Sequence, residues 1–510
     1  MMPRFAPRRL ATIACSIALL LVAGVALASV WLFRGDGVRV ALEQQAAARL
    51  GQPVSIGAAS VQFYPRIGLS LTDVQIGRPV RIRFASVSVS TGLRSLLSRK
   101  IVDGTVLLAD SEIALPLPAL STVSPATSQG GSGKPSTPPQ PSFTVESISR
   151  ISLNNISVTS RGRRITISGE SSLAGSLLTI TSMTVATEHS SVAVRGRVLL
   201  EPSLTVDADL AAKALDLDDL VALAAAFSPA PAPTGARTSA PTPPVRLTAR
   251  VSAASARAAG LELEALTSVV RLAGTRLSLS PTGFRVFGGR YDGDLDIDMR
   301  DSAVMKLTTR LTGIDVARLA AFGGADGAVT GRLSANATVT GRGTDLASVL
   351  SSARGSGNVS IVDGTIRRLN LLRTVVVFFG RPAPASPPAN DRFSRMDARI
   401  VLADGMARAE AFSMTSPDAD IAGQGSLDLR TTALDGHLDL SLSEALSQEA
   451  GTDFARYTRE GNRIVLPANI SGSLGEPKLS IDASAALKRG LRNELDRRMK
   501  GLLDRFRPQQ

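Results

Sequence analysis

The stretch "RIGLSLTDVQIG", residues 66–77, carries the pattern that decides the fold. Its apolar residues occupy odd positions before Asp73 and even positions after it, namely Ile67, Leu69 and Leu71, then Val74 and Ile76. Alternation of apolar and polar residues is typical of a β-strand with one buried face. The slip at Asp73 predicts a bulge or corner, because one extra residue moves every later side chain to the opposite face.

The same alternation returns along most of the 510-residue chain. It is clearest in five stretches, at 245–251, 295–299, 333–339, 427–429 and 438–442. The positions between the apolar residues are mostly Ser, Thr, Asp, Arg and Gly, and aromatic residues make up only 4% of the chain. This composition suits sheets with one apolar and one hydroxyl-rich face better than densely packed aromatic cores. We therefore expect a mainly β protein built from half-buried antiparallel strands.

The pentapeptide "IVDGT" occurs at 101–105 and again at 361–365, and "LADGM" at 402–406 is a weaker relative. Asp and Gly are common in active sites, so a catalytic motif is one interpretation. The other is a turn, because Asp tolerates left-handed backbone angles, Gly adopts them freely, and the flanking β-branched residues favour extended structure. The pattern favours a hairpin corner.

Short helices are predicted between groups of strands. "ALDLDDL" at 214–220 and "GIDVARL" at 313–319 each place an Asp where a helix is capped, before a short segment rich in Leu and Ala. "VRVALEQQAAARL" at 38–50 has helical spacing and ends at Gly51. Residues 483–510 predict a basic amphipathic helix and tail, with an apolar stripe at Leu487, Leu491, Leu495, Met499, Leu502 or Leu503, and Phe506.

Three stretches rich in Pro, Ala, Ser, Thr and Gly interrupt the strands, at 116–142, 228–244 and 381–390. Such sequences bury too little apolar surface to order themselves, so we interpret them as loops between strands or as spacers between sheet modules. They divide the chain into β modules at 34–115, 143–227 and 245–380 and a closing β module at 391–482.

Residues 10–33 form an uncharged apolar segment, preceded by Arg4, Arg8 and Arg9 and followed by Arg34. This length is enough to span a bilayer, which needs about 20 residues. The three preceding arginines place residues 1–9 in the cytoplasm and the rest of the chain outside. A cleaved signal peptide is the alternative, but its apolar region usually runs about 7–15 residues. A retained single-pass anchor is therefore predicted.

The net charge of +13 could indicate nucleic acid, anionic lipid or only solubility. No basic stripe with interleaved aromatic residues appears, so no nucleic-acid partner is predicted. The single cysteine, Cys15, lies inside the apolar segment. The chain therefore has no disulfide and no thiolate zinc site.

The sequence contains no convincing constellation of catalytic or metal-ligating residues. His189 and His437 are isolated in strand-like contexts, and "GGSGKPST" fails as a phosphate loop because Pro135 follows Lys134. "YDGDLDID" at 291–298 places an acidic residue at every second position, but it lacks the glycine and the terminal acid of a calcium loop. We interpret it as the solvated face of a strand, and we predict no catalytic residue, cofactor or metal site and no enzyme activity.

Three segments together resemble the AsmA family of envelope proteins. "ALEQQAAARLGQPVSIGAASVQFYPRIGLSLTDVQIG" at 41–77 is similar to the family's N-terminal signature of a short helix, Gly-x-Pro-Val and a strand pair. "GRGTDLASVLSSARGSGNVSIVDGTIRRLNLL" at 341–372 resembles its C-terminal signature, and "IVLPANISGSLGEPKLSID" at 464–482 resembles its closing strand element. The rest of the chain is similar in texture only.

The resemblance implies a long twisted antiparallel β-sheet curled into an elongated open groove. It also implies tethering to the inner membrane of a Gram-negative cell, a periplasmic location for most of the chain, and a role in outer-membrane biogenesis and lipid handling. The family carries no catalytic residues to transfer. The short length of this chain and its Pro-rich insertions depart from the larger, bridge-like members.

The composition supports a groove independently, because amphipathic strands with few large side chains must place their apolar faces against each other, a partner or a ligand. We expect phospholipid or another acyl-chain lipid to be handled or transported along this face. The alternative is a non-catalytic scaffold or regulator of outer-membrane protein assembly, with assembly proteins as its partners. The residues expected to line the groove are Ile67, Leu69, Leu71, Leu427, Leu429, Leu438 and Leu440.

The anchor generates a first testable prediction. The mature protein should retain Cys15 and fractionate with the inner membrane, with the rest of the chain open to protease only from the periplasmic side. N-terminal sequencing of the purified protein checks this. A mature chain that begins at Ser29 would contradict it.

Overall fold

The computed structural model describes residues 35–505 apart from 63–65, 93–94, 96–99, 117–143, 228–244, 301–302, 325, 328, 344, 368–373, 376–389, 450–458, 461–462 and 474. The predicted anchor at 10–33 and nearly all of the three Pro-rich stretches therefore lie outside the described residues. Across the helices that are described, none combines the length and the apolar character needed to cross a membrane.

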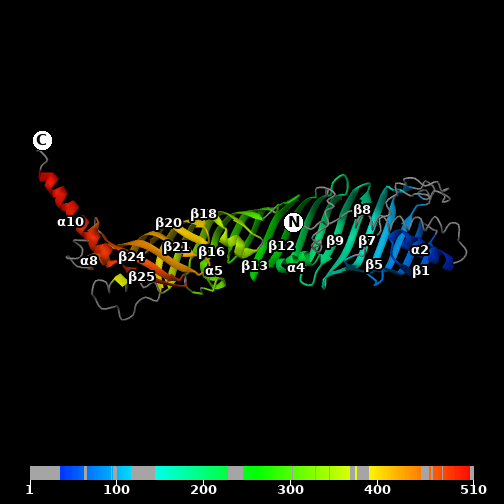
Figure 1. Cartoon of the computed structure of the whole chain (residues 1–510), viewed down its shortest axis with the longest axis horizontal. Coiled ribbons are helices and arrows are strands. Elements are labelled where there is room, and N and C mark those ends of the chain that lie inside the picture. Colours follow the sequence, from blue (N-terminus) through cyan, green and yellow to red (C-terminus); the bar gives the residue numbers. More distant parts are fainter. Residues whose placement is uncertain are drawn as a thin grey trace, which may run out of the picture. The chain divides into compact units, whose positions relative to one another are not determined.

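The chain is mainly β and divides into two compact units, residues 1–276 and 277–510 (Figure 1). In the first unit each strand of one ladder pairs with the next: β1 (Val54–Gln62), β2 (Ile67–Ile76), β3 (Ile82–Thr91), β5 (Gly104–Leu115), β7 (Ser147–Ser160), β8 (Arg163–Ala174), β9 (Leu177–Ala186), β10 (Ser191–Leu199), β11 (Thr205–Asp216), β12 (Arg246–Ala258) and β13 (Leu261–Ala273). β4 (Lys100–Ile101) and β6 (Thr144–Val145) form a separate small parallel pair. β14 (Arg276–Val286) lies at the division.

The ladder of the second unit is antiparallel throughout. Its strands, in order of pairing, are β15 (Gly289–Asp298), β16 (Val304–Asp315), β17 (Arg332–Arg342), β18 (Arg354–Arg367), β19 (Asn390–Ala403), β20 (Met406–Thr415), β21 (Ala419–Asp428), β22 (Ala433–Leu442), β24 (Arg463–Ser473) and β25 (Glu476–Ile481). The two-residue strand β23 (Arg459–Glu460) pairs with β24. Both units thus confirm the expected antiparallel-dominated, open sheet.

Two pairs in the first ladder are parallel, β5 with β7 and β11 with β12. Parallel neighbours need a crossover that returns the chain to the same end of the sheet. The segments that connect these strands contain the Pro-rich stretches 116–142 and 228–244. The strands on either side of each stretch are therefore neighbours in one sheet.

A row of left-handed residues creases the first unit. Asp73 in β2, Asp110 in β5 and Asn155 in β7 have φ angles of 49°, 46° and 55°. The register places Asp73 and Asp110 on opposite sides of Ala85 in β3, and Asn155 Nδ2 donates a 2.8 Å hydrogen bond to Asp110 Oδ1. Because each strand changes parity at the same row, apolar side chains on both sides of the crease remain on one face. The slip predicted at Asp73 is confirmed.

The repeated "IVDGT" motif serves the same purpose, and the predicted hairpin corner is wrong at its second copy. Asp363 has a φ angle of 53° but lies inside β18, which continues through Gly364 to Arg367. A Cβ atom on Gly364 would lie 2.1 Å from the ring of Phe393, so only glycine fits there. The first copy joins β4 to β5 at Asp103, also left-handed. Left-handed Asp redirects a strand here without reversing it.

The weaker motif "LADGM" is the true hairpin. Asp404 and Gly405 both have positive φ angles, 53° and 77°, and form a two-residue loop between β19 and β20. Positive angles at both loop residues match the twist of the flanking strands. Of the three related motifs, the least similar one alone turns the chain back on itself.

Short helices lie between the strands, as predicted. They are α2 (Gly35–Leu50), α4 (Leu217–Phe227), α5 (Val316–Phe322), α6 (Leu346–Ser351), α8 (Glu444–Glu449) and α10 (Ala483–Arg505). Asp216 Oδ1 accepts a 2.9 Å hydrogen bond from the Asp219 amide at the start of α4, and Asp315 Oδ1 accepts one from Ala317 at the start of α5, also 2.9 Å. Both predicted caps are therefore present.

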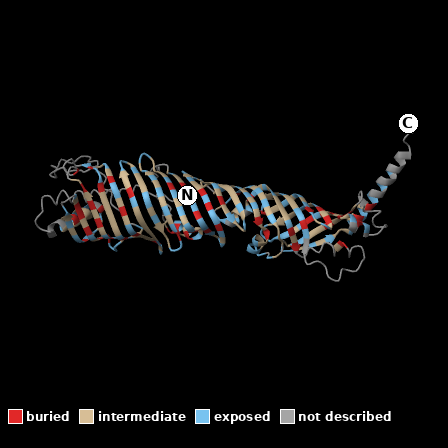
Figure 2. Ribbon diagram, turned by 180° about the vertical axis from the view of Figure 1, so that it is seen from behind, coloured by how far each residue is buried: buried red, intermediate tan, exposed pale blue. Residues whose placement is uncertain are grey.

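Buried apolar residues gather in one cluster in each unit (Figure 2). In the first unit, α2 covers the apolar face of β1, β2 and β3, and its Leu42 and Leu50 pack among the strand residues. In the second unit the cluster lies on β21, β22 and β24, with contributions from β18, β19 and β20. Along much of both ladders half-buried and exposed residues alternate (Figure 2). Some strands outside the clusters also carry buried residues, such as Leu263 and Leu266 in β13.

A second crease, which can be tested, lies at Ala265 in β13: this residue has a φ angle of 51°, is exposed, and falls where the register with β12 is interrupted. A left-handed alanine is strained by about 1 kcal/mol, so Ala265→Gly should raise the stability of the protein by about that amount. Ala254, the residue opposite in β12, keeps a negative φ angle, so Ala254→Gly should lower stability by about 0.5–1 kcal/mol. Urea unfolding of the two variants measures both changes. Equal destabilisation by both would contradict the crease.

Candidate functional site

The candidate site in the first unit is a half-buried apolar face. One row of it crosses seven strands from β7 to β13, through Ile148, Leu173, Leu178, Val198, Val206, Leu247 and Leu272. All but Ile148 are half-buried. A second row contains Met183, Val194, Leu210 and Val251, again half-buried. We call these two rows the first open face.

The first open face is continuous with the surface beneath α2. The cross-strand register runs from Leu69 through Val89, Val106, Ile151, Ser171 and Ile180 to Gly196, without leaving one side of the sheet. Leu69 is fully buried, whereas Val194 and Val198, near the far end of this path, are half-buried. The strand pattern is the same at both ends, so the difference in burial comes from the helix that covers only one of them.

The opposite side of these strands is polar and carries ion pairs between neighbouring strands. Arg250 in β12 reaches across to β11, where its guanidinium lies 3.0 Å from Asp207 and 2.5 Å from Asp209. The hydrogen bond to Asp209 and the charges of both carboxylates raise the pKa of Arg250. All three side chains are exposed, so the pairs contribute little to stability and mainly mark this side as solvated.

The second unit has an equivalent surface, which we call the second open face. Its clearest row crosses β16 to β22 through Leu307, Val339, Gly355, Leu402, Ala407, Leu427 and Leu434. Every member is half-buried. A neighbouring row on the same face ends in the closed core. Its residues Ile421, Leu440 and Leu466 are buried in the cluster of this unit. Each unit therefore combines a closed apolar core with an open apolar face.

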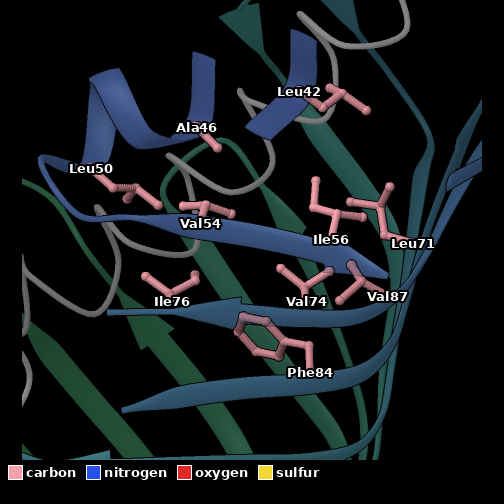
Figure 3. A pocket seen from close by; sticks show the side chains of 10 residues that line it. All are labelled: Leu42, Ala46, Leu50, Val54, Ile56, Leu71, Val74, Ile76, Phe84 and Val87. Atoms are coloured by element: carbon pink, nitrogen blue, oxygen red, sulfur yellow. The ribbon is translucent and has the colours of Figure 1, made fainter. Parts of the chain in front are cut away.

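A small cavity separates α2 from the strands that it covers (Figure 3). Its volume is about 60 Å³ and its walls are entirely apolar, with Leu42 and Leu50 on the helix facing Val74 and Phe84 on the strands. A cavity of this size is too small for an acyl chain. The covered end is a packed core with a minor void.

A larger hollow, of about 800 Å³, lies on the polar side of β16 to β20. Arg310, Asn336, Asn358 and Arg399 contribute to its wall. Arg395 also lines it, and its Nε donates a 2.6 Å hydrogen bond to Asp397 on the same strand, which lowers the pKa of that carboxyl. The wall of the hollow therefore mixes charged and amide side chains with apolar ones, among them Leu311, Val359 and Phe412.

The residues expected to line a groove divide between the core and the open faces. Leu69 and Leu71 are buried beneath α2 with Ile67 packed against them, and Leu438 and Leu440 are buried in the second cluster. Leu427 lies on the second open face. Leu429 follows the end of β21 and is 38% exposed. The structure therefore brings Ile67, Leu69 and Leu71 together in one core and Leu438 and Leu440 in another, while Leu427 alone lies on an open face.

The alternation at 245–251 was noted in the sequence and supplies Leu247 and Val251, but no residue of the first open face was assigned to the groove, although a signal for the others exists. "SVAVRGRVL" in β10 alternates as cleanly as the stretch at 66–77, and its apolar positions are Val192, Val194 and Val198. The alternation shows which side chains share a face, but it does not show whether another helix or strand covers that face. Whether an apolar strand face is buried depends on a helix or strand that is distant in sequence.

The acidic strand 291–298 forms the polar side of β15, as expected. Asp292, Asp294 and Asp296 lie opposite Arg310, Thr308 and Lys306 of β16. Arg290 donates hydrogen bonds of 2.7 Å and 2.8 Å to the Asp292 carboxylate and lowers its pKa. Within the described part of the chain, no group of three or more His, Cys, Asp or Glu side chains is arranged to hold a metal ion.

The comparison with known families matches residues 205–412 to the AsmA family. This region of the chain belongs to the AsmA family. It contains β11 to β13 of the first open face and β16 to β19 of the second, with most of β20. The segment 341–372 that suggested the family lies inside it, whereas 41–77 and 464–482 lie outside. No curated protein and no solved structure matches the chain.

The AsmA-family region thus coincides with much of both open faces. The cluster beneath α2 lies wholly outside it, as does most of the cluster on β21, β22 and β24.

Open and covered parts of one face should respond differently to the same substitution. Leu69→Arg buries a charge without a partner and should destabilise the protein by on the order of 3–5 kcal/mol. Val194→Arg, on the same face, should change stability by less than about 1 kcal/mol because the long side chain can reach water. Thermal unfolding of both variants measures this. A similar loss of stability from both would mean that the first open face is closed in solution.

Proposed function

We propose that this protein is a membrane-anchored, non-catalytic carrier of acyl-chain lipid that contributes to outer-membrane biogenesis. Acyl chains would lie against the open faces while lipid headgroups remain in water. The observation that carries this proposal is the row of half-buried apolar residues across β7 to β13, continuous with a buried core yet lacking its cover. Membership of residues 205–412 in the AsmA family supports it.

The energetics favour an elongated apolar ligand over a small one. Each methylene group removed from water contributes about 0.8 kcal/mol, so ten methylenes in contact with the face supply on the order of 8 kcal/mol. The contact is non-directional, so the chain can move along the rows without breaking specific bonds. A surface of this kind binds lipid tails without selecting a particular headgroup.

The polar side of the same strands suits a soluble, extracytoplasmic setting. Exposed ion pairs such as Arg250 with Asp207 and Asp209 keep that side in water. We propose an inner-membrane anchor at 10–33, with the described strands in the periplasm, where lipid must cross water to reach the outer membrane.

Site-specific photo-crosslinking tests the proposal. A photoreactive amino acid at Val194 or Val339, on the two open faces, should crosslink to radiolabelled phospholipid in living cells. The adjacent positions Arg195 and Thr340 are exposed and point to the polar side, so they should give little or no lipid adduct.

The comparison within each pair controls for expression and labelling. Lipid adducts at Val194 and Val339 with none at Arg195 and Thr340 support a lipid carrier. Protein adducts at Val194 and Val339, without lipid, would overturn the carrier and favour a scaffold for outer-membrane protein assembly.

A further inference from the structure

Among the described side chains of the last helix, α10, those that contact the sheet lie near its beginning. Asp482 Oδ1 accepts a 2.9 Å hydrogen bond from the Ala485 amide and caps the helix. Ala486 and Gly490 are buried, and the Arg489 guanidinium lies 2.6 Å from the Asp439 carboxylate in β22. The first two turns of α10 are therefore held by β22 and β24, and the helix continues past them (Figure 1).

An apolar stripe runs along the exposed part of α10. Leu487, Leu491, Leu495 and Met499 recur at every fourth residue and are 71%, 64%, 63% and 59% exposed. Residues four apart lie on the same side of a helix, so the four side chains form one continuous strip. Single exposed apolar residues are common on proteins, but a continuous strip of this length marks an interaction surface.

The helix is also strongly basic. Its 23 residues include seven Lys or Arg and three Asp or Glu, a net charge of +4. Lys488 and Arg492, both exposed, each follow a stripe residue directly, so their charges lie beside the strip. No described helix is apolar enough to span a bilayer, α10 included. An apolar strip flanked by basic residues fits the plane of a membrane interface.

We propose that α10 docks on the surface of an anionic phospholipid bilayer. The stripe would enter the boundary between headgroups and acyl chains, while Lys488 and Arg492 contact lipid phosphates. A second copy of this helix fits the strip less well, because two helices of charge +4 repel each other. This surface is distinct from the open faces, so the lipid that α10 contacts belongs to a bilayer and not to a carried molecule.

Flotation with vesicles tests the docking in the full chain. The protein is reconstituted through its N-terminal region into phosphatidylcholine nanodiscs and mixed with vesicles of phosphatidylcholine alone or of phosphatidylcholine with phosphatidylglycerol. It should float with the anionic vesicles only, and added salt should weaken the association. The variant Lys488→Glu with Arg492→Glu should bind at least about tenfold more weakly.

A second variant tests the apolar part with a matched control. Leu491→Gln with Leu495→Gln should abolish flotation, because the stripe loses its two central members. Val80→Gln with Val221→Gln changes two residues that are also large, apolar and exposed, at 49% and 71%, on other elements of the protein, and should leave flotation unchanged. Both double variants should keep the melting temperature of the parent protein.

The outcomes separate docking from its alternatives. Equal flotation with neutral and anionic vesicles, or retained flotation in the Leu491 and Leu495 variant, would overturn the proposal. Self-association that the same variant abolishes, without binding to vesicles, would instead assign the strip to a second copy. Lipid crosslinking at Val194 should persist when α10 is altered, so failure of docking leaves the acyl-chain proposal standing and the reverse also holds.

Discussion

The first unit depends on a backbone constraint: left-handed residues stand in one row across several of its strands. Asp73, Asp110 and Asn155 fall in one row across β2, β5 and β7, and Ala265 in β13 and Asp363 in β18 mark further creases. A flat amphipathic sheet would send its apolar side chains to alternate faces after each insertion. When adjacent strands change parity together, the sheet bends and the apolar residues on both arms of the bend still share a face. In the first unit the apolar face continues across the bend because these irregularities are aligned.

Once the apolar face is formed, its fate depends on what covers it. Helix α2 converts one end of the face in the first unit into a dry core, with only about 60 Å³ left empty. From β9 to β13 the side chains in the two rows of the first open face remain half-buried. Burial of apolar surface drives folding wherever cover is available, and surface left half-exposed retains its affinity for another apolar body. The same continuous apolar face of the first unit therefore stabilises the fold where α2 covers it and would bind lipid where it is open.

The features that were predicted correctly are those that depend on residues close together in the sequence. The alternation at 66–77, the slip at Asp73, the caps at Asp216 and Asp315 and the helix that ends at Gly51 all depend on residues within a few positions of each other, and all are confirmed. The "IVDGT" motif failed at 361–365 because a left-handed Asp-Gly pair suits both a hairpin and a crease. The deciding contact is Gly364 against the ring of Phe393, a residue of the next strand along the ladder.

The candidate site was harder to predict for the same reason. Leu69 and Val194 have equivalent neighbours in sequence, yet α2 buries one and leaves the other half-exposed. Amphipathic strands identify which side chains share a face, but they do not reveal which part of that face is covered. The resemblance to the AsmA family was read from 41–77, 341–372 and 464–482, and the family match lies at 205–412, where the strands are open. Of the three segments only 341–372 lies in that match, and the rest of the matched region resembled the family in texture alone.

Small residues explain why the open faces are surfaces and not filled cores. One row of the second unit passes through Ala337, Gly357, Ile400, Ala409, Gly425 and Gly436, so five of its six members carry at most a methyl group. Side chains of this size cannot reach across to an opposing layer, and the low aromatic content of the whole chain, 4%, removes the residues that could. An acyl chain, which is thin and uniformly apolar, fits a shallow apolar surface of this kind better than a packed protein layer does. A composition with many small and few aromatic residues does not fill a thick core, and the same composition suits the open lipid-binding face that we propose.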